Sequence, residues 1–302
     1  MKYLGIDIGG TEIKYGIVDD NGNIERSYSK ETEALKGADN LINNIENIIQ
    51  NIIKIEKING IGISTAGQVN RNNGQIIFAT DTIPGWTGVK LKKIIEERFK
   101  IQCYVDNDVN CACLGYMWRS MEEDYKDFIF LTLGTGIGGA IVINGQLYTG
   151  SHFIAGEFGH MTICKDGEEC TCGFKGCFER YASTSALIRR AKKQLKLPED
   201  FKLSGKYIFD KAKNNEKEYI DVINEWSYDV AIGIKNIVHM FNPSLIVIGG
   251  GVSAQGNYLI KFIQKHMNKI IMPSFLKGLV IKTSPSGNKA GMLGAIYGLK
   301  ML

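Results

Sequence analysis

The fold is indicated by the stretch YLGIDIGGTEIKYGIV, residues 3–18. Two apolar β-type runs, Tyr3–Ile8 and Ile13–Val18, lie on either side of a Gly-Gly-Thr turn. A third run, Gly22–Tyr28, follows the turn DDNG at residues 19–22. Short runs separated by turns of this composition predict an antiparallel meander of three strands.

The same plan returns in the second half of the chain. Phe128–Leu133 and Gly139–Ile143 are apolar runs joined by the glycine-rich turn GTGIGG, and Asn144-Gly145 follows. The turn contains the Gly-x-Gly-x-x-Gly pattern, but the residues after it read as a strand rather than a helix. A dinucleotide-binding interpretation therefore fails, and the sequence predicts two domains built on one plan.

Helical and parallel-strand patterns complete an α/β fold class. Helical spacing of apolar residues predicts helices at Ala38–Ile55, Leu91–Phe99, Val109–Arg119, most of 184–242, and Ala290–Met301. Buried strands are predicted at Ile58–Ile63, Gln102–Val105 and Leu245–Ile248. We expect an N-terminal domain of residues 1–118 and a C-terminal domain of residues 119–288, with the helix at 289–302 packing back on the first domain.

Composition excludes several classes of protein. The 302 residues suffice for two domains, and 44% hydrophobic with 23% charged residues is ordinary for a globular protein. The net charge of +4 includes no long basic block, so we expect no nucleic-acid partner. No apolar segment reaches the ~18 residues that span a bilayer, so we expect no membrane partner. Seven cysteines, an odd number, predict a reducing, cytoplasmic setting, with Cys103, Cys111 and Cys113 as core thiols.

A metal site is indicated by the stretch EFGHMTICKDGEECTCGFKGCFE, residues 157–179. His160, Cys170, Cys172 and Cys177 supply one imidazole and three thiolates, which make a closed tetrahedral zinc shell. A closed shell leaves no position for water, so the zinc is expected to be structural. The alternative is four buried or disulfide-forming residues, although Cys170 and Cys172 are too close to bridge comfortably.

Two acids bracket this segment. Glu157 precedes His160 and Glu179 follows Cys177, so a metal-fixed loop would present two carboxylates and an imidazole. Such a wall of hydrogen-bonding groups suits a polyhydroxylated ligand, whereas the alternative is that both acids are solvated surface residues. Cys164 could compete as a zinc ligand, but its position better suits a core residue at the end of a strand.

Three glycine-rich turns follow apolar strands, and two of them, in hairpins of opposite halves of the chain, could hold one phosphate chain through backbone N–H groups. Thr11 and Thr135 add hydroxyl donors, and Asp7 at a strand end is placed to hold magnesium, through water. The candidate phosphate-binding residues in these turns are Gly9, Gly10, Thr11, Thr135, Gly136, Gly249, Gly250 and Gly251.

The run VDNDVN, residues 105–110, stands where a strand ends and a helix begins. Asn107 or Asp108 could simply cap that helix. Phosphoryl transfer to an alcohol also needs one carboxylate to accept the hydroxyl proton. We therefore assign Asp108 as the candidate base and Asn107 as a candidate sugar ligand, with Asp106 facing the domain interior or the surface.

With these residues assembled, the chain resembles the ROK family of sugar kinases and repressors, in the actin-like ATPase superfamily. The resemblance implies two actin-like, ribonuclease H-like α/β domains with a cleft between them, and a homodimer. ROK repressors carry an extra N-terminal helix-turn-helix, which is not expected here because the first strand starts at residue 3. The matching segments are Asp7–Lys14, Asp106–Asn110, Leu133–Gly139, Glu157–Glu179 and Ile248–Ser253.

The resemblance also implies roles for individual residues. ATP and magnesium would be held by the glycine-rich turns with Asp7 and Lys14, and the zinc shell would orient the loop that binds sugar hydroxyls. Asp108 would be the general base of an ATP:hexose 6-phosphotransferase. The residues of the implied sugar site are Gly67, Thr80, Asn107, Asp108, Glu157, His160 and Glu179.

The choice of sugar is addressed by the segment GISTAGQVN, residues 62–70. It is similar to the Ser-Thr-Gly-Gly-Arg-Val-Asn pattern of N-acetylmannosamine kinases and departs from the Pro-Gly-Pro-Val-Asp of bacterial glucokinases. Gly67 and Thr80 match sugar-contact positions of the former, while Gln68 replaces the arginine. We expect N-acetylmannosamine first and glucose as the alternative. A non-catalytic sugar sensor is a further alternative, and a nucleotide-hydrolysing chaperone is disfavoured by the zinc segment and Asp108.

Overall fold

The computed structural model describes residues 1–121, 125–198, 200–285 and 287–302. Contacts within the chain divide it into two compact domains. The first comprises Met1–Glu123, Thr149–Ala155 and Asn288–Leu302, and the second comprises Asp124–Tyr148 and Gly156–Gly287. The short segment of residues 149–155 carries no sequence pattern that would assign it to the first domain.

The first domain is built on a five-stranded sheet of order β3-β2-β1-β4-β7. Strands β1, β2 and β3 are antiparallel neighbours, whereas β4 and β7 run parallel to β1. The strands are β1 Lys2–Ile8, β2 Glu12–Asp19, β3 Ile24–Glu31, β4 Gly60–Thr65 and β7 Cys103–Asn107, with a separate hairpin of β5 Gln68–Asn70 and β6 Gln75–Phe78.

The second domain repeats this plan. Its sheet has the order β10-β9-β8-β11-β12, in which β8, β9 and β10 are antiparallel and β11 and β12 run parallel to β8. The repeated hairpin plan predicted from the sequence is therefore confirmed, as is the strand after the Gly-x-Gly-x-x-Gly turn. The strands are β8 Phe128–Leu133, β9 Ile137–Ile143, β10 Gln146–Tyr148, β11 Leu245–Gly249 and β12 Val280–Thr283.

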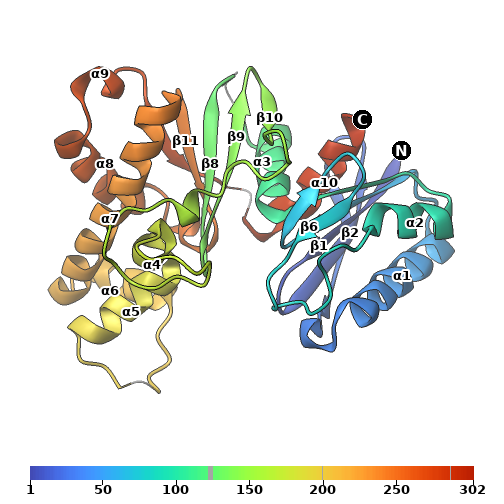
Figure 1. Cartoon of the computed structure of the whole chain (residues 1–302), viewed down its shortest axis with the longest axis horizontal. Helices are drawn as coiled ribbons and strands as arrows, with labels where there is room; N and C mark the ends of the chain where they lie inside the picture. Colours follow the sequence, from blue (N-terminus) through green and yellow to red (C-terminus); the bar gives the residue numbers. More distant parts are fainter. Residues whose placement is uncertain (122–124, 199, 286) are drawn as a thin grey trace. The chain divides into compact units, whose positions relative to one another are not determined.

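Helices cover the sheet of each domain (Figure 1). Those of the first domain are α1 Ala38–Ile55, α2 Leu91–Phe99, α3 Asp108–Arg119 and α10 Ala290–Lys300, with a short 3₁₀ turn at Ala34–Lys36. Those of the second are α4 Phe178–Ala182, α5 Thr184–Gln194, α6 Gly205–Lys213, α7 Lys217–Phe241, α8 Asn257–Ile270 and α9 Pro273–Leu276, with 3₁₀ turns η2 Phe158–His160 and η3 Gly251–Gln255.

One face of the first sheet packs on α1 and α2. Every residue of β4 is buried, as expected for a central strand covered on both faces. The predicted helical spacing in α1 is confirmed, because Ile45 and Ile49 point into one apolar cluster with Leu4 and Ile61. These contacts leave the carboxyl ends of β1, β4 and β7 at the same edge of the sheet.

The opposite face packs on α10 and α3 at close range. A Cβ atom added at Gly62 of β4 would lie 2.5 Å from the backbone carbon of Ala295 in α10. One added at Gly294 of α10 would lie 1.6 Å from the carbonyl oxygen of Cys111 in α3. Glycine at these two positions lets the backbones of helix and strand, and of helix and helix, touch directly.

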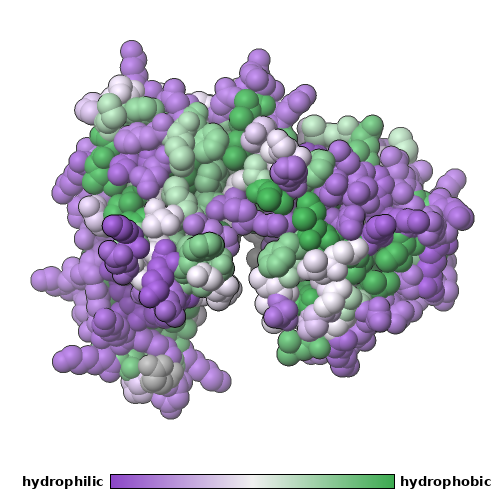
Figure 2. Space-filling model, viewed as in Figure 1, coloured by the Kyte–Doolittle hydropathy of each residue, from purple (hydrophilic) through white to green (hydrophobic). Residues whose placement is uncertain are grey.

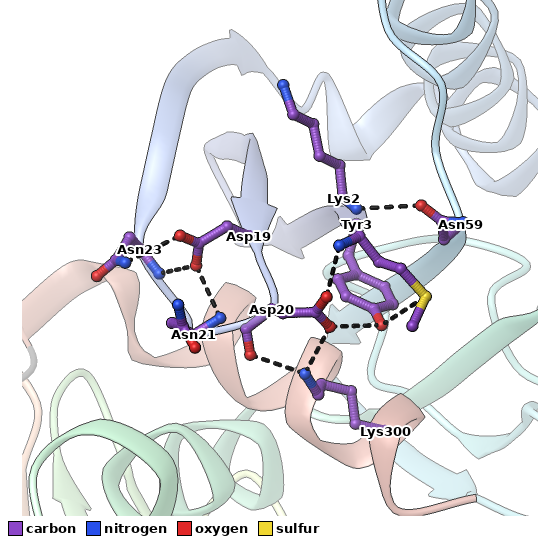
Figure 3. Close-up of polar contacts among 9 residues, drawn as sticks. Lys2, Tyr3, Asp19, Asp20, Asn21, Asn23, Asn59 and Lys300 are labelled. Atoms are coloured by element: carbon purple, nitrogen blue, oxygen red, sulfur yellow. Dashed lines mark hydrogen bonds and ion pairs between the residues drawn. The ribbon is translucent and has the colours of Figure 1, made fainter.

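A polar cluster near the chain termini joins Lys300, the last residue of α10, to Asp20 after β2 and to Tyr3 of β1 (Figure 3). Lys300 donates to the Asp20 backbone oxygen at 2.7 Å and to its Oδ1 at 3.0 Å, and Tyr3 donates to the same Oδ1 at 3.1 Å. The N-terminal amine and then Lys300 lower the pKa of Asp20 to about 2. Because the pKa of Asp20 is lower in the folded state than in the unfolded chain, its ionised carboxylate stabilises the fold above pH ~4. This stabilisation is lost as the pH falls through about 2.

The three core thiols expected from the sequence are confirmed, since Cys103, Cys111 and Cys113 are fully buried. On the face shown in Figure 2, hydrophilic side chains form most of the margin of each domain, and apolar side chains gather in smaller areas between them. Among the residues that the structure describes, no helix is long and apolar enough to cross a membrane.

The close packing of α10 on β4 makes a direct prediction. Gly62→Ala inserts a methyl group against the backbone of Ala295, so the free energy of unfolding should fall by about 1–3 kcal/mol. Gly10→Ala is the control, because a Cβ there meets nothing within 4 Å. Urea unfolding followed by circular dichroism measures both variants. Equal stability of the two variants would show that the helix yields without cost.

Candidate active site

Three neighbouring strands bring polar side chains to one edge of the first sheet. Asp7 of β1 lies beside Ser64 of β4, and Thr65 of β4 lies beside Asn107 of β7. Ser64 Oγ donates a hydrogen bond of 2.6 Å to Asp7 Oδ1. Because β1, β4 and β7 are parallel, their carboxyl ends meet here, which is where α/β folds commonly place their reacting groups.

Asp7 has a crowded environment. Burial raises the pKa of its carboxyl, while the Ser64 hydrogen bond and the Lys14 charge oppose that rise. A Cβ at Gly291 of α10 would lie 2.6 Å from Asp7 Oδ1, so the first turn of α10 approaches this carboxylate. A half-buried carboxylate at a strand end suits an oxygen-preferring cation held through water.

Asn107 caps α3. Its Oδ1 accepts hydrogen bonds from the backbone N–H groups of Val109 at 2.8 Å and Asn110 at 3.2 Å. Its Nδ2 donates to the Gly67 carbonyl and to Asp108 Oδ1, both at 2.9 Å. The cap that the sequence left open between Asn107 and Asp108 is therefore Asn107, and its amide already has partners on both sides.

Asp108 is the first residue of α3 and is exposed to solvent. Desolvation by the surrounding protein raises the pKa of the Asp108 carboxyl to about 6, and the negative charge of the Asp7 carboxylate adds to the rise. Its Oδ1 accepts hydrogen bonds from Asn107 Nδ2 and from the Val109 N–H. A carboxyl that titrates near 6 yet remains reachable can accept a proton at neutral pH.

The hairpin β5–β6 supplies the two remaining candidate sugar contacts in this domain. Gly67 has a φ of +100°, and a Cβ there would lie 2.8 Å from the Phe78 carbonyl oxygen, so only glycine fits without strain. Thr80 is exposed two residues after β6, and its hydroxyl lies 3.0 Å from that of Thr82. The structure thus brings Gly67 to Asn107 and leaves Thr80 on the adjoining loop.

The first glycine turn is exposed, and a residue that follows β3 holds it by a hydrogen bond. Gly9, Gly10 and Thr11 connect β1 to β2, and the Thr32 hydroxyl donates to the Gly9 carbonyl at 2.7 Å. Lys14 lies on β2 directly opposite Asp7. The turn therefore keeps its backbone N–H groups near the strand end that carries Asp7.

The second domain holds the candidate metal ligands. One ligand atom from each of His160, Cys170, Cys172 and Cys177 lies within 4.8 Å of all the others. Cys172 Sγ and Cys177 Sγ are 3.5 Å apart, and Cys170 Sγ lies 3.7 Å from His160 Nδ1. Zinc–sulfur bonds of about 2.3 Å in tetrahedral geometry place ligand sulfurs about 3.8 Å apart, so these donors fit zinc.

Glu179 joins the metal segment to the second glycine turn. Its Oε1 lies 3.3 Å from Cys170 Sγ, and its Oε2 lies 3.5 Å from the Ile137 N–H nitrogen. A Cβ at Gly136 would approach Glu179 Oε2 to 2.5 Å. Just beyond α4, Thr184 donates its N–H to the Gly134 carbonyl at 2.9 Å. The metal ligands and the phosphate-type turn thus share one support.

The turn that carries Glu157 and His160 rests on β9. A Cβ at Gly159 would lie 2.1 Å from the Ile137 carbonyl oxygen, so the turn η2 contacts the strand backbone directly. Glu157 and His160 remain exposed at either end of this turn. Glu157 and His160 therefore share one exposed turn, whereas the half-buried Glu179 lies on α4, so the wall of two acids and an imidazole stays a prediction.

The last glycine turn also belongs to the second domain. Gly250 has a φ of +81°, and a Cβ there would lie 2.5 Å from the Leu133 carbonyl oxygen. Gly249 ends β11 and Gly251 begins η3, so this turn lies against the start of the turn that contains Thr135. The two glycine turns of the second domain that could bind the nucleotide are consequently adjacent.

Sequence reasoning missed residues that hold the candidate groups in place. Ser64 supports Asp7, and Asp106, with Arg71 and Tyr104, supports Asn107 from beneath. A hydroxyl-containing pair at the end of a buried strand could have pointed to Ser64. Arg71 carries no local signal, because it follows β5 of the separate hairpin and its partner Asp106 lies on β7.

Comparison with known proteins identifies the family. The ROK family profile matches residues 3–300. The chain belongs to the ROK family. A glucokinase of Thermotoga maritima is 31% identical over 305 residues, which cover 98% of this chain and 96% of that protein.

Two solved structures of the ROK family share the fold. The ROK glucokinase of Streptomyces griseus, solved with glucose and AMPPNP, is 30% identical with a TM-score of 0.81, covering 98% of each chain. A Listeria monocytogenes protein proposed to be an N-acetylmannosamine kinase is 30% identical with a TM-score of 0.87, covering 100% of this chain and 99% of that one. These likenesses establish the two-domain α/β fold, with sugar kinases as relatives.

The four clustered donors predict one structural zinc per chain. Cys172→Ser should remove the metal, because a three-donor shell binds far more weakly than a closed one. Cys164→Ser is the matched control, since Cys164 is an exposed cysteine of the same segment outside the donor cluster. Metal analysis of purified protein by plasma mass spectrometry measures both. Zinc retained in Cys172→Ser but lost from Cys164→Ser would reassign the ligands.

Proposed function

We propose that the protein is an ATP- and magnesium-dependent sugar kinase that phosphorylates the 6-hydroxyl of a hexose. The observation that carries this proposal is Asp108, an exposed carboxylate with a pKa of about 6 at the edge of the sheet that also presents Asp7. Membership of the ROK family and the kinases among its relatives support the reaction class.

The proposed reaction uses Asp108 as the general base. Its carboxylate accepts the proton of the sugar hydroxyl while that oxygen forms a bond to the γ-phosphorus of ATP. The bond between the γ-phosphorus and the bridging oxygen breaks, and ADP leaves with the electron pair. Asn107 Nδ2 and the Val109 N–H both donate to Asp108 Oδ1, which fixes the carboxylate and leaves Oδ2 to accept the proton.

Phosphate binding is assigned to the glycine turns. In the first domain the Gly9 N–H closes the turn on the Glu12 carbonyl at 3.0 Å, so the exposed Gly10 and Thr11, with Lys14, are the proposed donors there. Thr135 and Gly136 are the proposed donors of the second domain. Gly249, Gly250 and Gly251 complete the nucleotide-binding set. Asp7 would hold a magnesium ion through water. The magnesium ion would neutralise part of the negative charge of the transferred phosphoryl group.

Zinc is assigned a structural role. His160, Cys170, Cys172 and Cys177 would hold it, and Glu179 and Glu157 would present carboxylates from the same fixed loop to sugar hydroxyls. A rigid loop lowers the entropy lost when several hydroxyls are bound at once. Metal loss should therefore weaken sugar binding more than it changes the chemical step.

N-acetylmannosamine is the first sugar that we propose. The small Ala66-Gly67 pair stands where glucokinases carry a proline-rich loop, and the Gly67 carbonyl accepts from Asn107 Nδ2. Thr80 follows Ala79, which packs beside Gly67. Glucose is the second candidate, which the glucokinase relatives favour. A homodimer is proposed from the family alone. A sensor that binds sugar without turnover would bind these sugars but release no ADP.

The role of Asp108 can be tested by substitution and by pH. Asp108→Asn should keep sugar and ATP binding but lower kcat by about two to four orders of magnitude. In the wild type, kcat/KM should fall about tenfold for each pH unit below about 6, because the base must be ionised. Asp39→Asn, another aspartate in the first turn of a helix, is the control and should keep both kcat and the profile. A coupled ADP-release assay reads all three proteins, and near-normal turnover of Asp108→Asn would reduce Asp108 to a sugar ligand.

Sugar choice can be tested on the same assay. We expect kcat/KM for N-acetylmannosamine to exceed that for glucose, because donors built for an acetamido group are left unpaired by glucose. Gln68→Arg should widen the margin by restoring a charged donor, whereas Asn72→Arg, which adds the same charge in the hairpin turn, should not. A tenfold preference for glucose would instead place the protein with the glucokinases.

A further inference from the structure

A buried carboxylate lies directly beneath the candidate base. Asp106 is fully buried, and its two oxygens have four partners. Oδ1 accepts from the Asn107 N–H at 2.7 Å and from Asn110 Nδ2 at 3.0 Å. Oδ2 accepts from the Tyr104 hydroxyl at 2.5 Å and faces Arg71 Nε at 3.6 Å. From the sequence we expect Asp106 to face the domain interior or the surface, and no sequence pattern predicts which residues it contacts.

Arg71 reaches this carboxylate from a different element. It directly follows β5, at the start of the turn that connects β5 to β6. Its guanidinium carbon lies 5.6 Å from the centre of the Tyr104 ring, and its side chain is only 20% exposed. The planar guanidinium therefore both stacks on β7 and pairs with Asp106, which ties the hairpin to that strand.

The same hairpin is held at a second point. Asn107 Nδ2 donates to the carbonyl of Gly67, just before β5. Asp106 in turn fixes the Asn107 backbone through the 2.7 Å bond to its N–H. The far strand of the hairpin is tied to the segment before α2, where the Ile76 N–H donates to the Val89 carbonyl at 2.9 Å. Gly67 and Arg71 instead join its near side to Asn107 and Asp106, so together they set its orientation relative to the start of α3.

We propose that Arg71 and Asp106 form a positioning pair, which sets the hairpin β5–β6 against the start of α3 and so determines sugar affinity. The inference rests on the proposed kinase function and deepens it. Fold stability alone does not require such a pair, because a buried ion pair contributes little beyond well-packed apolar residues of similar volume. Neither residue touches the reacting atoms in this proposal.

The chain provides a matched control for the chemistry. Arg98 of α2 pairs with Glu46 of α1, and its guanidinium carbon lies 5.7 Å from the centre of the Phe99 ring. This arginine also combines an ion pair with an aromatic contact in the first domain. Its partners have no part in the candidate site, so its loss controls for removing an arginine ion pair elsewhere in the domain, although its side chain is 51% exposed against 20% for Arg71.

The test compares Arg71→Met with Arg98→Met in the full-length protein. Wild type is first assayed for ADP release with N-acetylmannosamine, N-acetylglucosamine, glucose and fructose, and the best sugar is used for the variants. Arg71→Met should raise the KM for that sugar at least tenfold and leave the KM for ATP within twofold. Arg71→Lys, which keeps the charge but loses the planar stacking, should fall between, and Arg98→Met should match the wild type in both KM values.

A second variant covers failure to fold. If Arg71→Met does not fold, Arg71→Met combined with Asp106→Asn removes both charges and should recover the thermal midpoint but not the sugar KM. An unchanged sugar KM in either variant, with active wild type, would overturn the positioning role alone. A wild type that phosphorylates none of the four sugars would instead overturn the proposed function.

Discussion

The first domain depends on the direct contact of α10 with the sheet and with α3. Gly62 and Gly294 let backbones touch where any side chain would hold them apart. That contact brings the first turn of α10 against Asp7 and packs α3, which begins at Asp108, on the same face. A helix from the end of the chain thus adjoins Asp7, whose pKa is raised by burial. Desolvation also raises the pKa of Asp108, and the Asp7 carboxylate adds to that rise.

In the second domain, the candidate residues are held in place by side chains that fit a metal ion. The loop between β10 and α4 contains little regular structure, so four converging donors offer the fixed point that a hydrophobic core would otherwise supply. Glu179 contacts both Cys170 Sγ and the N–H of Ile137 at the glycine turn. One carboxylate therefore connects the metal segment with the candidate phosphate-binding turn.

Much of the fold follows from local patterns in the sequence. Alternating apolar runs predict β1, β2 and β8, helical spacing predicts α1 and α2 to the residue, and the spacing of His160 and the three cysteines predicts their convergence. The short hairpin β5–β6 and the edge strand β12 escape prediction because three or four residues carry too little periodicity. The Arg71–Asp106 pair escapes because its members join separate elements. Asn107 shows a different limit, since an amide at a strand end suits a helix cap and a sugar ligand equally well.

The candidate groups separate into two sets, each held by contacts inside its own domain. Asp7, Asn107 and Asp108 are connected through Ser64, Gly67 and the start of α3, whereas the metal ligands are connected to Gly136 through Glu179. Each set is thereby ordered before any substrate binds, which lowers the entropy that binding must overcome. Because Glu179 lies in the metal segment and contacts the glycine turn, loss of the metal should weaken nucleotide binding as well as sugar binding. The carboxylate pair in the first domain shares no residue with that path, so the pKa of Asp108 should remain unchanged by loss of the metal.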